Sequence, residues 1–190
     1  MRLPLKHAAR RSSQAGFSMI EVLISMVVVT VGLVGMLAVF AFATSSTQSA
    51  QQDMIAKQLA SEAMESIFTA RETAQVTWGQ IRNVGTGDTP DGIFVTGFQG
   101  IRESGSDAIF GTADDADANP RYLTQVGRDG VLGTSDDRPL PLTNYKRKIE
   151  IAAVTDTTSL RLVTITIQYT VSPMTVPKSY VVTAYISQFR

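Results

Sequence analysis

The sequence predicts an α+β protein, in which a long N-terminal helix packs on a C-terminal antiparallel β-sheet. Three observations predict this fold. Residues 22–43 are uncharged and rich in branched aliphatic side chains, and residues 53–71 place apolar side chains at steps of three and four. Residues 145–190 are rich in β-branched and aromatic side chains that alternate with polar ones. We therefore expect a helix with a hydrophobic first half and an amphipathic second half, followed by the sheet.

The charges are unevenly distributed along the chain, although the 190 residues carry a net charge of zero. Residues 1–16 hold four of the 17 basic residues and no acid, so the remainder has 13 basic and 17 acidic residues, a net of −4. Because the remainder has no basic patch, we expect no direct binding of nucleic acid.

Composition also excludes several kinds of chemistry. The chain has no cysteine, which rules out disulfides, thiolate zinc sites and cysteine nucleophiles. Its one histidine, His7, lies in the basic N-terminal segment. A hydrolase that used paired aspartates would need a shaped, partly apolar cleft, to which the sequence does not point. We predict that the protein is not an enzyme.

The uncharged segment 22–43 is long enough to cross a membrane as a helix. At about 1.5 Å of rise per residue it spans the hydrocarbon core of roughly 30 Å. The basic residues before it place the N-terminus in the cytoplasm and the bulk of the chain outside. The sequence therefore predicts a single-pass membrane protein whose C-terminal domain lies outside the cytoplasm.

Two simpler interpretations of this segment remain open. A secretory signal peptide cut after Ala43 would fit the small residues at Ala41 and Ala43, but the apolar run is longer than usual and starts beside an acid, Glu21. A plain signal anchor would explain the hydrophobicity and the orientation. It would leave both Glu21 and the Gly16-Phe17 pair unexplained.

The residues 16–25, Gly-Phe-Ser-Met-Ile-Glu-Val-Leu-Ile-Ser, resemble the cleavage signal of type IV pilins and type II secretion pseudopilins. The usual form of that signal is G-F-[ST]-x-x-E-x-[LMV] after a short basic leader. The resemblance implies that residues 1–16 are a leader peptide, which a prepilin peptidase removes by cutting between Gly16 and Phe17. It also implies that this enzyme methylates the new amino group of Phe17, and that the fold is pilin-like.

Glu21 is then predicted to act in assembly. Cleavage would leave an ammonium group on Phe17 at the edge of the hydrocarbon, and the Glu21 carboxylate of one subunit can face the ammonium of its neighbour. Each charge compensates the desolvation of the other, and the loss of one would leave its partner unpaired in a low dielectric.

The helical pattern continues beyond the membrane segment, so we expect one helix from about Phe17 to about Arg71. We divide it into a transmembrane and filament-core part, 17–43, and an amphipathic continuation, 44–75. The segment 51–71 resembles PilV-type minor pilins more loosely than the cleavage signal resembles its family. The predicted apolar stripe consists of Ala56, Leu59, Ala60, Ala63, Ile67 and Ala70.

Residues 76–144 are rich in Gly, Asp, Thr, Asn and Pro and are predicted to be mostly loops. Residues 105–115 and 127–137 are two copies of G-x-D-x-x-x-G-T-x-D-D, 22 residues apart. Calcium binds several carboxylate and carbonyl oxygens, and such loops resemble calcium-binding loops of secreted bacterial proteins. The alternative is a pair of solvated Asp-Gly turns, in which a duplicated unit could form a β-hairpin. The candidate calcium ligands are Asp107, Asp114, Asp115, Asp129, Asp136 and Asp137.

Residues 145–190 predict a meander of three antiparallel strands, at 145–154, 160–171 and 178–187, with turns at 156–159 and 172–177. The apolar stripe of the helix is predicted to pack on one face of this sheet. Many pilins close their terminal loop with a disulfide, which this chain without cysteine cannot form, and bound calcium could hold the loops instead.

The sequence as a whole predicts a structural subunit, a minor pilin of a type IV pilus. The expected partners are prepilin peptidase, other pilin or pseudopilin subunits and the inner membrane, and the expected destination is a pilus at the cell surface. The alternatives are a type II secretion pseudopilin and a binding or adhesive domain on an ordinary signal anchor that is never assembled.

Overall fold

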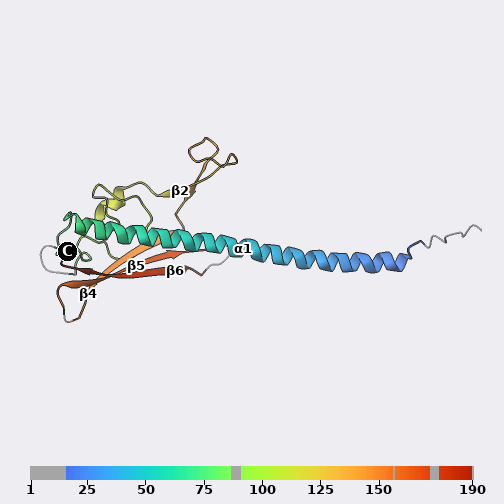
Figure 1. Ribbon diagram of the computed structural model, residues 1–190, viewed down its shortest axis with the longest axis horizontal. Coiled ribbons are helices and arrows are strands. Elements are labelled where there is room, and N and C mark those ends of the chain that lie inside the picture. Colours follow the sequence, from blue (N-terminus) through green and yellow to red (C-terminus); the bar gives the residue numbers. More distant parts are fainter. Residues whose placement is uncertain (1–15, 87–90, 156, 172–175, 190) are drawn as a thin grey trace, which may run out of the picture. The chain divides into compact units, whose positions relative to one another are not determined.

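A computed structural model describes residues 16–86, 91–155, 157–171 and 176–189 (Figure 1). The chain forms two compact units, residues 1–46 and 47–190. The predicted leader, apart from Gly16, lies outside the described residues, as does most of the predicted turn at 172–177. Helix α1, Met19–Glu72, contributes its first part to the first unit and its remainder to the second.

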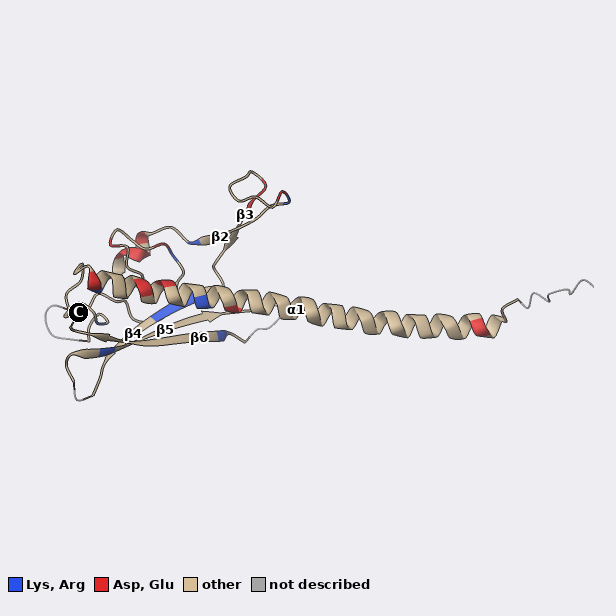
Figure 2. Cartoon of the chain, viewed as in Figure 1, with Lys and Arg blue, Asp and Glu red and all other residues tan. Residues whose placement is uncertain are grey.

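The first unit consists of the apolar part of α1. The sequence has no charged residue between Glu21 and Asp53, and Figure 2 shows a long tan stretch of α1 with no red or blue. The helix is long and apolar enough to cross a membrane, and none of the residues in its most apolar stretch is buried. Its hydroxyl groups are satisfied inside the helix: the Ser25 and Thr30 side chains donate to the carbonyls of Val22 and Met26, at 2.8 and 2.7 Å. The segment thus exposes a hydrocarbon surface, as a membrane anchor requires.

The second part of α1 is amphipathic because its apolar side chains recur at helical spacing. The predicted stripe is confirmed, since its six residues are the buried residues of the helix: Ala56, Leu59, Ala60, Ala63, Ile67 and Ala70. Four of the six are alanines, which allow the helix backbone to approach the sheet closely.

The main sheet of the second unit has four antiparallel strands in the order β1-β4-β5-β6. The predicted meander is β4 (Tyr145–Ala153), β5 (Leu160–Tyr169) and β6 (Lys178–Ser187), and the prediction did not include β1 (Gln99–Gly100), which pairs with β4. Strict alternation in β5 points every second residue toward the core, as predicted. The α+β fold with a long N-terminal helix on an antiparallel sheet is therefore confirmed.

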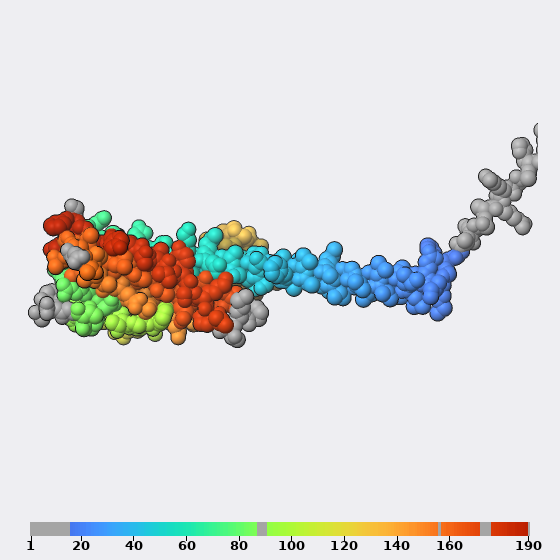
Figure 3. All heavy atoms as spheres, turned by 90° about the horizontal axis from the view of Figure 1, so that it is seen from below, coloured from blue at the N-terminus to red at the C-terminus, as the bar shows by residue number. Residues whose placement is uncertain are grey.

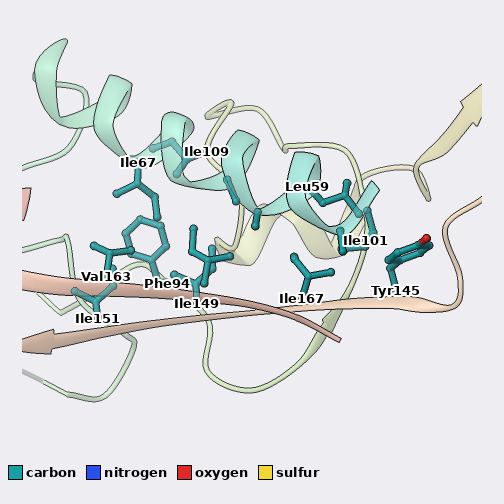
Figure 4. Packing of buried hydrophobic residues seen from close by; sticks show 14 of the residues in the cluster. Leu59, Ile67, Phe94, Ile101, Ile109, Tyr145, Ile149, Ile151, Val163 and Ile167 are labelled. Carbon is teal, nitrogen blue, oxygen red and sulfur yellow. The ribbon is translucent and has the colours of Figure 1, made fainter. Parts of the chain in front are cut away.

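The core lies between α1 and one face of this sheet (Figure 4). Ile67 from the helix, Phe94 from the following loops and Val163 from β5 meet there and are fully buried. The loop residues between helix and sheet therefore belong to the core. Asn83 fixes this loop to β4, because its side-chain amide donates to the Ile149 carbonyl at 2.8 Å and its amide oxygen accepts the Ile151 N–H at 2.7 Å.

The loop region also contains a second, smaller sheet of two strands. Strands β2 (Tyr122–Gln125) and β3 (Arg138–Pro141) pair antiparallel, and the second acidic copy, 127–137, lies within the connection between them. The first acidic copy forms a loop that leads into a short 3₁₀ helix, Ala113–Asp117. The second copy thus forms the end of the β2–β3 hairpin, and the first copy lies against the core.

Candidate functional sites at the helix start and in the repeated loops

The predicted cleavage junction lies just before the first turn of α1. Gly16 and Phe17 are exposed and belong to no regular element, and the helix begins at Met19. The Ser18 hydroxyl oxygen accepts the Glu21 N–H at 3.3 Å, and the Ser18 carbonyl accepts the N–H groups of Glu21 and Val22 at 3.1 and 3.2 Å. The Gly16-Phe17 peptide bond is therefore accessible to a peptidase, immediately before the regular helix.

Ser18 and Glu21 have the spacing of a capping box, S-x-x-E, with Ser18 as the N-cap residue and Glu21 at the third helical position. The sequence reasoning missed this function, although the pattern is visible in the sequence. The carboxylate of Glu21 also lies at the positive end of the helix dipole, which favours a negative charge. Glu21 therefore stabilises the start of its own helix in addition to its predicted role between subunits.

The first acidic loop is held by hydrogen bonds from its own backbone to its aspartates. The two carboxylate oxygens of Asp115 accept the N–H groups of Gly105 and Gly111, at 2.9 and 2.6 Å. Asp114 accepts the Thr112 hydroxyl at 2.6 Å and the Asp107 N–H at 3.3 Å. These bonds close the loop and satisfy donors that would otherwise be unpaired.

The second loop repeats this network at equivalent positions. Asp137 accepts the N–H groups of Gly127 and Gly133, at 3.0 and 2.6 Å. Asp136 accepts the Thr134 hydroxyl at 2.6 Å and the Asp129 N–H at 3.3 Å. The repeated sequence is therefore a repeated structure, whose carboxylates have a structural function whether or not a cation also binds.

Steric constraints explain why the motif has glycine at two positions. A Cβ on Gly105 would lie 2.2 Å from the Asp114 carboxyl group, and one on Gly127 would lie 2.2 Å from that of Asp136. The second glycine of each copy, Gly111 or Gly133, has a φ of +90°, which L-residues rarely adopt.

The pKa values of the carboxylates reflect these contacts. A hydrogen bond from the Thr112 hydroxyl lowers the pKa of Asp114, and one from the Thr134 hydroxyl lowers the pKa of Asp136. The pKa of Asp137 is lowered mainly by a hydrogen bond from the backbone N–H of Gly127. Burial raises the pKa of Asp115 instead, despite its two backbone hydrogen bonds and the nearby Arg147. Asp115 is the member of the set that the core encloses.

Within each copy a hydrogen bond links the first two candidate calcium ligands, from the Asp107 N–H to Asp114 and from the Asp129 N–H to Asp136. Among the residues that the structure describes, no group of three or more acidic or histidine side chains is arranged to hold a metal ion. Calcium binding therefore stays a prediction.

The test of calcium binding is the melting temperature of the full chain in detergent, with and without millimolar calcium. A site that is saturated a hundredfold above its Kd would add about 2.7 kcal/mol to the free energy of unfolding. Magnesium at the same concentration is the control. An unchanged melting temperature would mean that the loops are only structural.

The two copies also provide a matched pair of glycine substitutions. Gly111→Ala and Gly133→Ala both place a Cβ at a φ of +90°, at a cost of about 1–2 kcal/mol. At Gly111 the new Cβ would also lie 2.5 Å from Cδ1 of Ile149, whereas Gly133 has open space. We expect Gly111→Ala to cost about 1–3 kcal/mol more than Gly133→Ala in urea unfolding. Equal losses would contradict the tight packing of the first copy.

The comparison with protein families bears on the N-terminal site. The model of the prokaryotic N-terminal methylation motif matches residues 11–37, which include Gly16, Phe17 and Glu21. Neither the curated proteins nor the solved structures contain a match to this chain. Proteins with this motif are processed by prepilin peptidase and assemble with other pilins, and the apolar helix fits membrane anchoring. The match to this motif therefore supports a resemblance to type IV pilin-like proteins, and the helix-on-sheet fold is consistent with it.

Proposed function

We propose that the protein is a minor pilin, a structural and non-catalytic subunit of a type IV pilus. It is cleaved after Gly16, methylated on Phe17 and then assembled through the first part of α1. The observation that carries this proposal is the geometry at Glu21, a lone acid in the first turn of α1, four residues after the predicted new N-terminus. The following residues 22–43 of the helix are all uncharged and exposed.

The exposed side chains of this helix support assembly as well as membrane anchoring. Phe17, Met36 and Phe42 are each more than 70% exposed, and no other described part of the chain covers them. In the membrane, lipid tails surround such a surface; outside it, only the equivalent helices of other subunits can do so. A subunit that leaves the membrane during filament growth therefore needs neighbours of its own kind.

The location of the subunit follows from the same observations. We propose that the protein first lies in the inner membrane, with its N-terminus in the cytoplasm and the second unit in the periplasm, and that assembly then takes it to the cell surface. The looser resemblance of residues 51–71 to PilV-type minor pilins supports the minor-pilin function.

Mass spectrometry of the mature N-terminus tests the proposal. We expect N-methyl-Phe17 as the first residue in cells that contain prepilin peptidase, and an intact Met1 in cells that lack it. An intact Met1 in both strains would indicate an ordinary signal anchor, and a first residue of Thr44 would indicate a secreted protein. A second measurement distinguishes a pilus from a type II secretion pseudopilus. We expect the methylated chain in sheared surface filaments.

A further inference from the structure

The two acidic copies differ in what lies against them. In the first copy, Ile109 is 1% exposed and Phe110 is packed against the core. The equivalent residues of the second copy, Val131 and Leu132, are 56% and 64% exposed. The same loop structure therefore buries its apolar pair in one place and presents it to solvent in the other.

The residues that surround the first copy show which kind of protein surface such a loop packs against. Cδ1 of Ile149 lies beneath Gly111, and the Phe110 N–H donates to the hydroxyl of Ser66 on α1 at 3.4 Å. The Arg147 guanidinium lies 4.6 Å from the centre of the Phe110 ring, and its Nη2 lies 3.5 Å from Oδ2 of Asp115. The receiving surface is therefore apolar, includes small residues of a helix, and supplies a cation to the last aspartate of the loop.

The second copy offers the same groups to a partner. We call residues 127–137 the hairpin loop. It contains one arginine and three aspartates, a net charge of −2, and its last aspartate, Asp137, corresponds to Asp115. A contact of the kind made by the first copy thus requires an apolar surface with an excess of positive charge.

One groove on the second unit has this chemistry. It has a volume of about 620 Å³ and lies between α1 and the start of β6. Ala50, Met54 and Tyr180 supply the apolar lining, and Met54 is 72% exposed. Lys57 and Lys178 also line this groove, which we call the α1–β6 groove.

The charges in the α1–β6 groove leave one cation available. Asp53 accepts the Tyr169 hydroxyl at 2.7 Å and lies 3.4 Å from the Lys178 ammonium group, so these two charges face each other. Lys57 makes no ion pair or hydrogen bond with any described side chain. The net charge of the groove is +1, opposite to that of the hairpin loop.

We propose that the hairpin loop of one copy of this chain docks in the α1–β6 groove of a second copy, with Leu132 on Met54 and the loop aspartates toward Lys57. In Figure 1 the β2–β3 hairpin lies on one side of α1 and β6 on the other. Figure 3, viewed from the side of β6, shows β6 on the visible face of the second unit. The two surfaces are different and lie on opposite sides of α1, so we propose a head-to-tail contact, which can repeat from one copy to the next.

Disulfide crosslinking tests this contact directly, because the natural chain has no cysteine. The full chain with Leu132→Cys and Met54→Cys is oxidised in membranes of the cells that express it. Each copy then carries both halves of the contact, so we expect a ladder of dimers and higher multimers. The Leu132→Cys and Met54→Cys chains, expressed together as separate single variants, should give a dimer and no ladder.

The matched control replaces Met54→Cys by Tyr185→Cys; Tyr185 is 63% exposed, compared with 72% for Met54, and lies near the far end of β6 from the α1–β6 groove. A ladder of equal yield in that control would overturn the proposal, as would the absence of a ladder in the test pair. Dimers formed as readily by Leu132→Cys alone would also overturn it, because they would indicate a symmetric hairpin contact.

A second variant separates docking from chance collision. In a Val131→Cys, Met54→Cys chain, Leu132→Asp should remove the ladder and leave the melting temperature unchanged, since Leu132 is mostly exposed. An unchanged ladder would contradict the apolar contact. The inference rests on the proposed function in one respect, because assembly is what brings copies of the chain together. A chain that is methylated at Phe17 but forms no ladder would refute this contact alone. An unprocessed chain would refute the proposed function.

Discussion

Glu21→Gln is expected to leave cleavage after Gly16 intact and to remove most of the protein from filaments. Glutamine serves equally well at the third helical position of a capping box, so the start of α1 should be preserved. In the proposed assembly, the substitution removes only the negative charge and so leaves the Phe17 ammonium of the neighbouring subunit unpaired in an apolar environment. Breaking a buried ion pair in this way costs about 3–5 kcal/mol, enough to prevent stable incorporation.

The measurement combines mass spectrometry of the N-terminus with immunoblots of sheared filaments and of membranes. Glu65→Gln is the control, because Glu65 is an exposed acid on the second part of the same helix. Normal incorporation of Glu21→Gln would show that the charge is dispensable. Loss of cleavage would assign Glu21 to recognition by the peptidase instead.

Arg147→Met is expected to destabilise the second unit by about 3–5 kcal/mol. Arg147 is 3% exposed, points into the core from β4, and lies against the Phe110 ring and Asp115. Burial lowers its pKa to about 10, because the enclosed site disfavours the charged guanidinium. Removing the cation leaves the Asp115 carboxylate enclosed, with only its two backbone hydrogen bonds.

The control lies next to it on the same strand. Lys148 points to the opposite face of the sheet and pairs at 2.9 Å with Glu150, whose side chain is 54% exposed. Lys148→Met should therefore cost at most about 1 kcal/mol in urea unfolding of the full chain in detergent. The double variant Asp115→Asn, Arg147→Met should recover part of the loss. Equal losses at Arg147 and Lys148 would contradict the buried pair.

The parts of the fold that the sequence predicted are those with regular periodicity. The helix stripe from Ala56 to Ala70 and the alternation of β5 each repeat over several turns or residues, so local pattern and final burial agree. Strand β1 has two residues and no pattern, and only its pairing with β4 makes it a strand. The same holds for Asn83, whose two bonds to β4 join residues more than 60 positions apart.

The sequence carries a signal for the two buried arginines in the alternation of β4 and β5. Arg147 and Arg161 fall on the core-facing positions of β4 and β5, where every other residue is apolar or a tyrosine. The Arg161 guanidinium lies 4.1 Å from the centre of the Trp78 ring and donates to the Ile81 carbonyl at 2.5 Å. A charge on the apolar side of an alternating strand thus predicts a buried partner, although the partner itself depends on the tertiary fold.

At the candidate sites, the sequence predicted the residues better than their contacts. The match to the N-terminal methylation motif includes Gly16, Phe17 and Glu21, but the cap from Ser18 was missed. The sequence predicts that the repeat forms either calcium-binding loops or solvated Asp-Gly turns, and it leaves open what the carboxylates contact. The structure shows that they bind backbone N–H groups, a function that depends on how each loop folds back on itself.

The hydroxyl groups of the membrane segment have a mechanical consequence. Because Ser25 and Thr30 donate to their own helix, the surface from 22 to 43 offers a neighbouring helix only dispersion contacts, which have no preferred direction. No hydrogen bond from these two hydroxyl groups to a neighbouring helix would then fix the register between such helices. In a bundle of them, the charge at Glu21 would be the polar group that sets this register.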